Sequence, residues 1–160
     1  MTLRIETKPP WDLYSELYPR ICSDSAERIV FVRGWKMITK QSMRDECSAA
    51  LQFPPLQAEK WDSFPEDWDA FSEDLFSLEW ICKTRKILVI LETEKVLQQA
   101  DDRDRLVFFR ILLDAPAEHA AEWLNRGNIK GELEIILQCD QQYRQAIEQL
   151  LARAKAGQKT

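Results

Sequence analysis

The sequence predicts an α/β fold in which helices pack on a small, three-stranded parallel sheet. Three segments rich in β-branched, aliphatic or aromatic residues indicate the strands: Arg28–Met37, Lys86–Glu92 and Gly131–Asp140. Helical segments separate them, and parallel strands need crossover connections of that kind. The middle segment, "KILVILE", is a continuous apolar run, which is typical of a strand buried on both faces.

Residues 1–27 are expected to form an N-terminal extension, for which capping of the sheet's edges is one role left open. They contain Pro9-Pro10, Pro19 and scattered aromatic residues. This composition predicts an irregular arm with room for a short helix from Pro10 to Leu17. The first strand then begins at Arg28 and ends near a glycine.

A helix is expected after the first strand, in "SMRDECSAALQF". Ser42 is the predicted N-cap, with Asp45 three residues later. Four apolar residues follow at helical spacing: Met43, Cys47, Ala50 and Leu51. The helix should end at Phe53, because a residue that precedes proline is disfavoured in the helical conformation.

A second helix is predicted from Ser63 to about Trp80. Ser63 and Glu66 fit a capping box, and Pro65 suits a first helical turn. Its apolar stripe is formed by Ala70, Phe71, Leu75 and Leu78.

Two more helices flank the third strand. The segment from Asp104 to Arg126 is mostly helical and is expected to break or bend at Pro116. Residues 141–160 predict an amphipathic helix packed on the domain of residues 28–140. Its apolar face is formed by Tyr143, Ile147, Leu150 and Leu151. The predicted order of elements is therefore β, α, α, β, α, β, α.

The negative charge of the chain is concentrated in one segment. The 160 residues carry a net charge of −5. Residues 59–79 hold eight acids and one base, or −7, so the remainder is slightly positive. The acidic balance argues against direct binding of nucleic acid. A field this concentrated would instead steer a basic protein partner.

The sequence gives little support for an enzyme. Its one histidine, His119, lies in "APAEHAAEW", which looks like a helix surface, so we interpret it as an ordinary surface or packing histidine. No glycine-rich phosphate loop is present. Asp69 and Glu73 would stand side by side on one helix, whereas paired catalytic carboxylates face each other across a cleft. We predict no catalytic residue, no cofactor and no metal site, with catalysis by His119 or metal binding by the acids as minor alternatives.

The four cysteines are far apart and form no CxxC pair, so we expect buried free thiols. They are Cys22, Cys47, Cys82 and Cys139. The first residues lack the apolar stretch of a signal peptide, and no run approaches membrane-spanning length. We expect a cytoplasmic monomer that does not contact membranes, with a dimer contact through the closing helix as a minor alternative.

Helical spacing divides the acidic helix into an apolar face and an anionic face. The anionic face and its flanks hold Glu66, Asp67, Trp68, Asp69, Ser72 and Glu73. The helix dipole stabilises acids in the first turn, but Glu73 lies beyond it and forms a like-charge i,i+4 pair with Asp69. On composition alone, a binding face and a merely solvated face explain this pattern equally well.

The segment "PEDWDAFSEDLFSLEWI", followed by "ILVIL" and later "EIIL", resembles the barstar family, whose members carry a W-D-A-F/L motif before a central strand. The resemblance covers roughly residues 28–140 and implies a small α/β domain with a three-stranded parallel sheet. It also implies inhibition of a cytotoxic, barnase-like ribonuclease, whose basic active site the acidic helix would block. By motif, Asp69 would pair with active-site cations, and Glu73 would stand where the substrate phosphate sits.

The chain departs from the family pattern around the acidic helix. Pro65-Glu66-Asp67 replaces the family's Gly-x-Asn, and Glu73 replaces an aspartate. The longer segment "PLQAEKWDSF" replaces a short aromatic loop, so Trp61 or Phe64 would supply the missing aromatic ring. The acid expected on the following helix falls among the mixed charges of Arg103-Asp104-Arg105.

We therefore predict a ribonuclease inhibitor or immunity protein of a toxin–antitoxin pair. The expected partner is a basic ribonuclease or another cationic protein. Its predicted contacts are Asp69, Glu73, Trp68, Glu66, Asp67, Ser72 and Trp61. The alternative is a barstar-fold protein-interaction module without ribonuclease inhibition.

Overall fold

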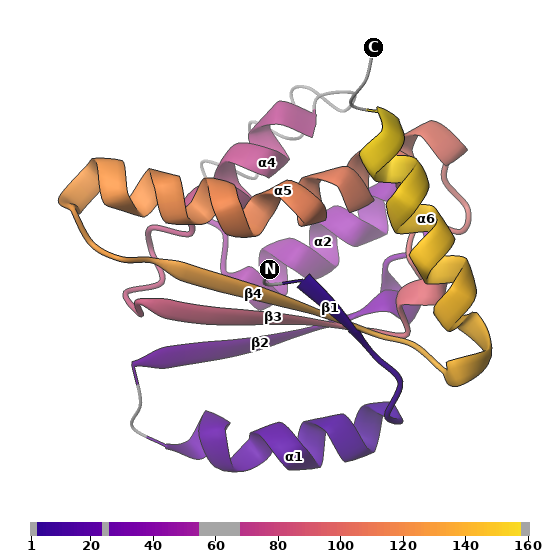
Figure 1. The fold of residues 1–160 in the computed structure, drawn as a ribbon, viewed down its shortest axis with the longest axis horizontal. Coiled ribbons are helices and arrows are strands. Elements are labelled where there is room, and N and C mark those ends of the chain that lie inside the picture. The colour runs from indigo at the N-terminus through magenta and orange to yellow at the C-terminus, as the bar shows by residue number, and fades with distance from the viewer. Residues whose placement is uncertain (1–2, 24–25, 55–67, 158–160) are drawn as a thin grey trace.

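The computed structural model describes residues 3–23, 26–54 and 68–157 (Figure 1). Its elements are, in order, β1 (Leu3–Glu6), α1 (Pro10–Cys22), β2 (Glu27–Arg33), α2 (Lys40–Leu51), α4 (Trp68–Ser77), β3 (Arg85–Leu91), α5 (Asp102–Gly127), β4 (Glu132–Gln138) and α6 (Arg144–Ala156). Short 3-10 helices follow three of the strands: η1 (Gly34–Lys36), η2 (Thr93–Lys95) and η3 (Gln141–Tyr143). The predicted α/β class is confirmed.

The described strands form one parallel sheet in the order β1-β4-β3-β2. The prediction of three strands is wrong, because the N-terminal arm contributes a fourth. β1 pairs with β4 in the register that places Leu3 opposite Ile135. The stretch "LRIE" has four residues, which is too short for an alternating pattern to stand out from the sequence around it.

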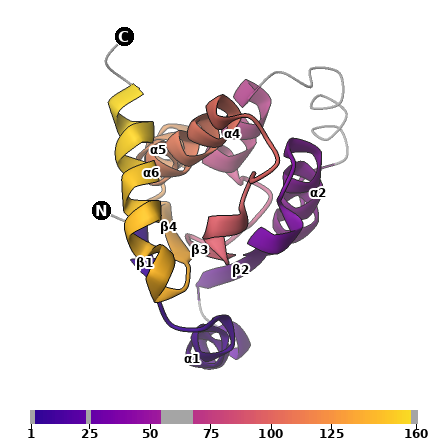
Figure 2. The ribbon, with the colours of Figure 1, turned by 90° about the vertical axis from the view of Figure 1, so that its right-hand side faces the viewer.

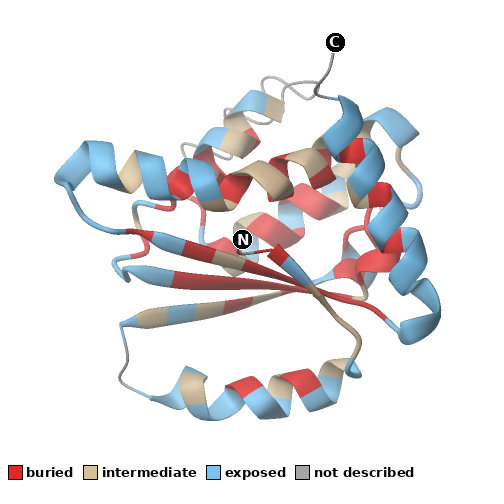
Figure 3. Cartoon of the chain, in the orientation of Figure 1, coloured by how far each residue is buried: buried red, intermediate tan, exposed pale blue. Residues whose placement is uncertain are grey.

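Helices cover both faces of this sheet (Figures 1 and 2). α2, α4, α5 and α6 lie over the face that is uppermost in Figure 1, called the upper face below. Among the described helices, α1 alone lies over the opposite, lower face. Strands β3 and β4 are buried along most of their length (Figure 3), as the apolar run of the middle strand predicts.

The sheet supplies side chains to two separate cores, because successive residues of a strand point to opposite faces. The larger core lies on the upper face, where Val32 and Ile135 of the sheet pack with residues of α2, α4, α5 and α6. The smaller core lies on the lower face and contains Leu13, Leu17, Ile87, Val89, Leu91 and Ile136.

The N-terminal arm is more regular than predicted. Helix α1 begins at Pro10, as expected, but it extends beyond Leu17 to Cys22 with Pro19 inside it. Leu13 and Leu17 are buried against the sheet. This burial stabilises a helix that the proline-rich sequence alone would not support.

Two helices near the site differ in detail from the prediction. Ser42 is not the N-cap of α2; Thr39 is, and its hydroxyl accepts from the backbone N–H of Ser42 while Ser42 Oγ accepts from that of Thr39, both at 3.0 Å. α5 is also continuous through Pro116. It packs against α4, α6 and β4, and these contacts compensate for the backbone hydrogen bond that proline cannot donate.

The closing helix buries Ile147 and Leu150, as predicted. Tyr143 was wrongly assigned to the same face, because it lies in η3 before α6 begins and is exposed. None of the described helices is both long and apolar enough to cross a lipid bilayer.

Candidate functional site

Helix α4 separates apolar and acidic side chains as its spacing predicts. Phe71 and Leu75 are buried in the upper-face core. Asp69 and Glu73, four residues apart, are exposed. The apolar stripe fixes the rotation of the helix about its axis, so these carboxylates must face solvent.

Of the two carboxylates of this face that the structure describes, Glu73 is the more available. Among the residues that the structure describes, no basic side chain forms an ion pair with it. Asp69 takes part in an interaction within the chain. The hydroxyl of Ser72 donates to the Asp69 carbonyl oxygen at 2.9 Å, so it is also bonded within the helix.

Trp68 packs inward more than outward. Its ring is half-buried and contacts the edges or faces of Phe71 and Phe108. Its indole N–H donates to Asp104 Oδ1 at 2.9 Å, and Lys40 Nζ lies 5.0 Å from the ring centroid. Asp104, from the segment where the sequence suggested a partner-binding acid, therefore holds Trp68 in place from α5.

A groove of about 350 Å³ lies between α4 and α5, next to Glu73. Its lining consists of Glu73, Asp74, Phe76, Ser77, Glu79, Glu122 and Arg126. Four carboxylates thus face one guanidinium, so the groove is anionic. Arg126, which also lines the groove, forms ion pairs with both Glu79 and Glu122.

Glu122 was not among the residues predicted from the sequence. It lies four residues before Arg126, and such a pair indicates an ordinary exposed ion pair on a helix. The packing of α5 against α4 is what brings Glu122 into the same groove as Glu73. Local spacing carries no information about that contact.

Of the two interpretations of His119, surface or packing, the structure supports packing, and the helix surface that its neighbours suggested is wrong. Its side chain is fully buried, and its Nδ1 lies 2.7 Å from the carbonyl oxygen of Phe76 in α4. The neighbouring alanines of "APAEHAAEW" are consistent with this, since small side chains let another element approach closely.

The remaining predicted contacts are Trp61, Glu66 and Asp67. They lie outside the described residues, as do the proposed cap residues Ser63 and Pro65. α4 is described from Trp68 and ends at Ser77, three residues before the predicted end.

The cysteines are free, but the expectation that all four are buried is wrong. Cys47 and Cys139 are buried, whereas Cys22 and Cys82 are exposed. Within the described ranges, no group of three or more histidine, cysteine, aspartate or glutamate side chains is arranged to hold a metal ion.

Comparison with known families gives one match. A family model described as Barstar (barnase inhibitor) matches residues 27–156. The matched region runs from β2 through α6 and leaves out β1 and α1. A search among curated proteins finds no match.

Proposed function

The chain belongs to the barstar family, and from that premise we propose that it inhibits a basic ribonuclease by covering its active site with the exposed face of α4. The observation that carries the proposal is Glu73, an exposed carboxylate with no cationic partner among the described residues, beside an anionic groove. Repulsion between Glu73 and the other carboxylates of the groove slightly destabilises the free protein, and a cationic partner would offset that repulsion.

The proposed mechanism is electrostatic and steric. A ribonuclease must hold RNA phosphates with cationic side chains, and a carboxylate can accept the same charge-assisted hydrogen bonds as a phosphate oxygen. Glu73 would occupy a phosphate position, and the helix behind it would exclude RNA from the cleft. No bond is made or broken.

The groove beside Glu73 supports a cationic partner as well. A lysine or arginine entering it would meet Glu73 on the α4 side and Glu122 on the α5 side. Arg126 already pairs with Glu79 and Glu122 there, so a partner's cation would be drawn mainly to Glu73.

The direct test is titration of the protein into a barnase-type ribonuclease assay. We expect stoichiometric inhibition that weakens with added salt, because the association is steered by charge. Glu73→Gln should weaken inhibition by about 30-fold or more, the effect of losing a hot-spot residue worth about 2 kcal/mol.

Glu148→Gln is the matched control. Glu148 is an exposed glutamate on α6, paired with Arg144, and its replacement changes the net charge by the same amount. It should leave inhibition nearly unchanged, and Glu73→Gln should leave the melting temperature unchanged or slightly higher. Binding without inhibition would support the interaction-module alternative. A large loss of thermal stability in Glu73→Gln would instead assign that carboxylate a structural role.

A further inference from the structure

The C-terminal end of α4 is capped by side chains of α5. The last four carbonyl groups of a helix have no partner within it. Here the Asp74 carbonyl accepts from the backbone N–H of Leu78 at 3.0 Å. The Phe76 carbonyl lies 2.7 Å from His119 Nδ1, and the Ser77 carbonyl accepts from Trp123 Nε1 at 2.7 Å. Two of the four groups therefore bond to another helix.

This end of α4 needs such support because it does not end in glycine. Leu78 follows the helix with a φ of 39°, in the left-handed region, which is unfavourable for a residue with a side chain. Its side chain is 1 % exposed, so its burial in the core offsets part of that strain. The chain turns sharply here, and the last turn of α4 depends on contacts from outside the helix.

The protonation state of His119 follows from its neighbours. A carbonyl oxygen can only accept a hydrogen bond, so Nδ1 must carry a proton, and in the neutral imidazole Nε2 then presents a lone pair. The Lys86 ammonium lies 3.4 Å from Nε2 and can donate to it. Burial lowers the pKa of His119 to about 4 and that of Lys86 to about 8, so at neutral pH the imidazole is neutral and the lysine is charged.

Lys86 is held in place independently of His119. The side chain is 2 % exposed and belongs to the second residue of β3. Its Nζ donates to the Lys83 carbonyl oxygen at 2.7 Å and lies 3.5 Å from the centroid of the Trp123 ring. The ammonium group thus contacts both α5 residues that bond to α4.

We propose that His119, Trp123 and Lys86 form a clamp that positions the last turn of α4, and with it Glu73, for binding the partner. Glu73 precedes Phe76 by three residues, so the two lie about 4.5 Å apart along the helix axis. Phe76 and Ser77, whose carbonyls the clamp holds, also line the groove beside Glu73. This proposal rests on the proposed function, because it assigns positioning residues to the same site.

Two substitutions of His119 separate positioning from simple packing. In His119→Asn the side-chain amide nitrogen replaces Nδ1 and can still donate to the Phe76 carbonyl. In His119→Gln the amide reaches the position of Nε2, so the donor is misplaced. We expect His119→Gln to bind a barnase-type ribonuclease about tenfold more weakly than His119→Asn, which is the effect of one lost hydrogen bond.

Trp123→Phe provides a second, independent variant. It keeps an aromatic ring beside Lys86 but removes the donor to the Ser77 carbonyl, and it should also weaken binding by about tenfold. Equal affinities of the Asn and Gln variants, or losses that follow only the melting temperature, would overturn the clamp.

Nuclear magnetic resonance tests the clamp even if no ribonuclease is bound. The imidazole ¹⁵N shifts of the wild-type protein should show a proton on Nδ1, and a proton on Nε2 would overturn the proposal. Exchange of the Leu78 amide hydrogen, which bonds to the Asp74 carbonyl, should be faster in His119→Gln than in His119→Asn. If these results appear while the wild-type protein fails to inhibit, the clamp stands and the proposed ribonuclease target is wrong.

Discussion

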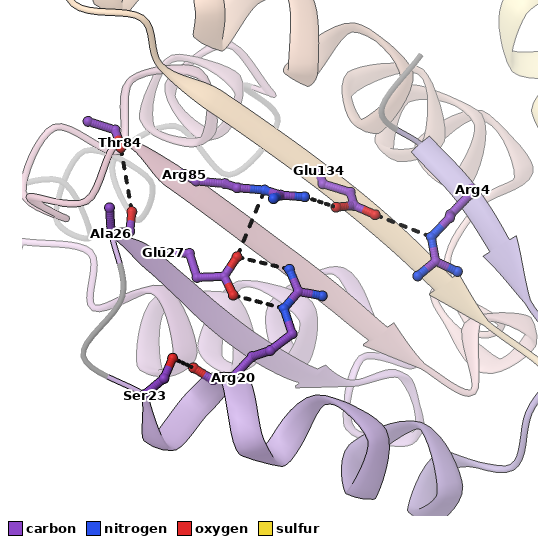
Figure 4. Close-up of polar contacts among 8 residues, drawn as sticks. All are labelled: Arg4, Arg20, Ser23, Ala26, Glu27, Thr84, Arg85 and Glu134. Carbon is purple, nitrogen blue, oxygen red and sulfur yellow. Dashed lines mark hydrogen bonds and ion pairs between the residues drawn. The ribbon is translucent and has the colours of Figure 1, made fainter.

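The two faces of the sheet are held together in different ways. On the upper face, four helices bury a large apolar core, and α4 and α5 carry the anionic groove. On the lower face, α1 covers a much smaller apolar core. That smaller core is bordered by a row of alternating charges that crosses all four strands (Figure 4).

The row of charges joins the two N-terminal elements, β1 and α1, through the three strands that lie between them. Arg20 of α1 donates to both carboxylate oxygens of Glu27 in β2, at 2.8 and 2.9 Å. Arg85 of β3 lies between Glu27, at 3.9 Å, and Glu134 of β4, at 3.2 Å. Arg4 of β1 then donates to Glu134 at 3.2 Å.

The ion pairs of the lower face and the apolar burial of the upper face contribute differently to the fold. The arginines of the row are nearly half exposed, and such pairs contribute little net stability. They can still select the register of β1 and the position of α1, since opposite charges meet in only one arrangement. The upper face relies on burial, which supplies most of the folding free energy and a rigid support for the site.

Removing a buried leucine from each face should reveal the largest difference. Leu112→Ala in α5 should lower the free energy of unfolding by about 3–4 kcal/mol, because the surrounding helices cannot close the cavity. Leu13→Ala in α1 should cost about 2–3 kcal/mol, because a single helix can settle onto the sheet. Urea denaturation measures both, and a larger loss for Leu13→Ala would contradict the comparison.

Acid should weaken the upper face through His119. Its pKa is about 4 in the folded protein and 6.5 ordinarily, so as the pH falls through 6.5 the unfolded chain takes up a proton that the folded chain does not. The contribution of neutral His119 to the free energy of unfolding is therefore complete above pH 6.5. The free energy of unfolding should fall by about 2 kcal/mol between pH 7 and 5. His119→Asn should flatten this part of the profile in urea denaturation. An unchanged slope would show that other groups cause it.

Glu27→Gln should test the row of charges on the lower face. Arg20 is the main cause of the lowered pKa of Glu27, so the ion pair stabilises the fold above the ordinary carboxyl pKa of 4.5 and is lost as the pH falls below it. Because Arg20 is partly exposed, we expect a loss of about 1 kcal/mol at pH 7. A double-mutant cycle with Arg20→Met measures the coupling, and a coupling near that of a core contact would remove the contrast between the faces.

The sequence predicts the central fold well because its signals are local and strong. "KILVILE" is apolar throughout, and β3 is buried over Lys86–Leu91 as such a run requires. β1 escaped prediction because its pairing with β4 joins residues far apart in the sequence. The continuity of α5 through Pro116 also depends on tertiary packing that no window of sequence contains.

For the site, the sequence predicts which side chains of α4 face outward but not which residues of α5 contact that helix. The exposure of Asp69 and Glu73 follows from helical periodicity alone. The bond between Trp68 and Asp104, the burial of His119 and the position of Glu122 all arise where α5 meets α4. These are contacts between distant segments, and a single sequence carries no signal for them.

The pairing of β1 with β4 also constrains the timing of assembly. Leu3 meets Ile135, so the edge of the sheet remains open until β4 has been synthesised and has docked on β3. After β4 has docked and before β1 pairs with it, the apolar residues Ile135 and Leu137 border an unprotected edge, to which a strand of another molecule could add. β1 therefore closes this edge only late in assembly. Because it is short and carries Arg4 and Glu6, it disfavours the addition of strands from other molecules.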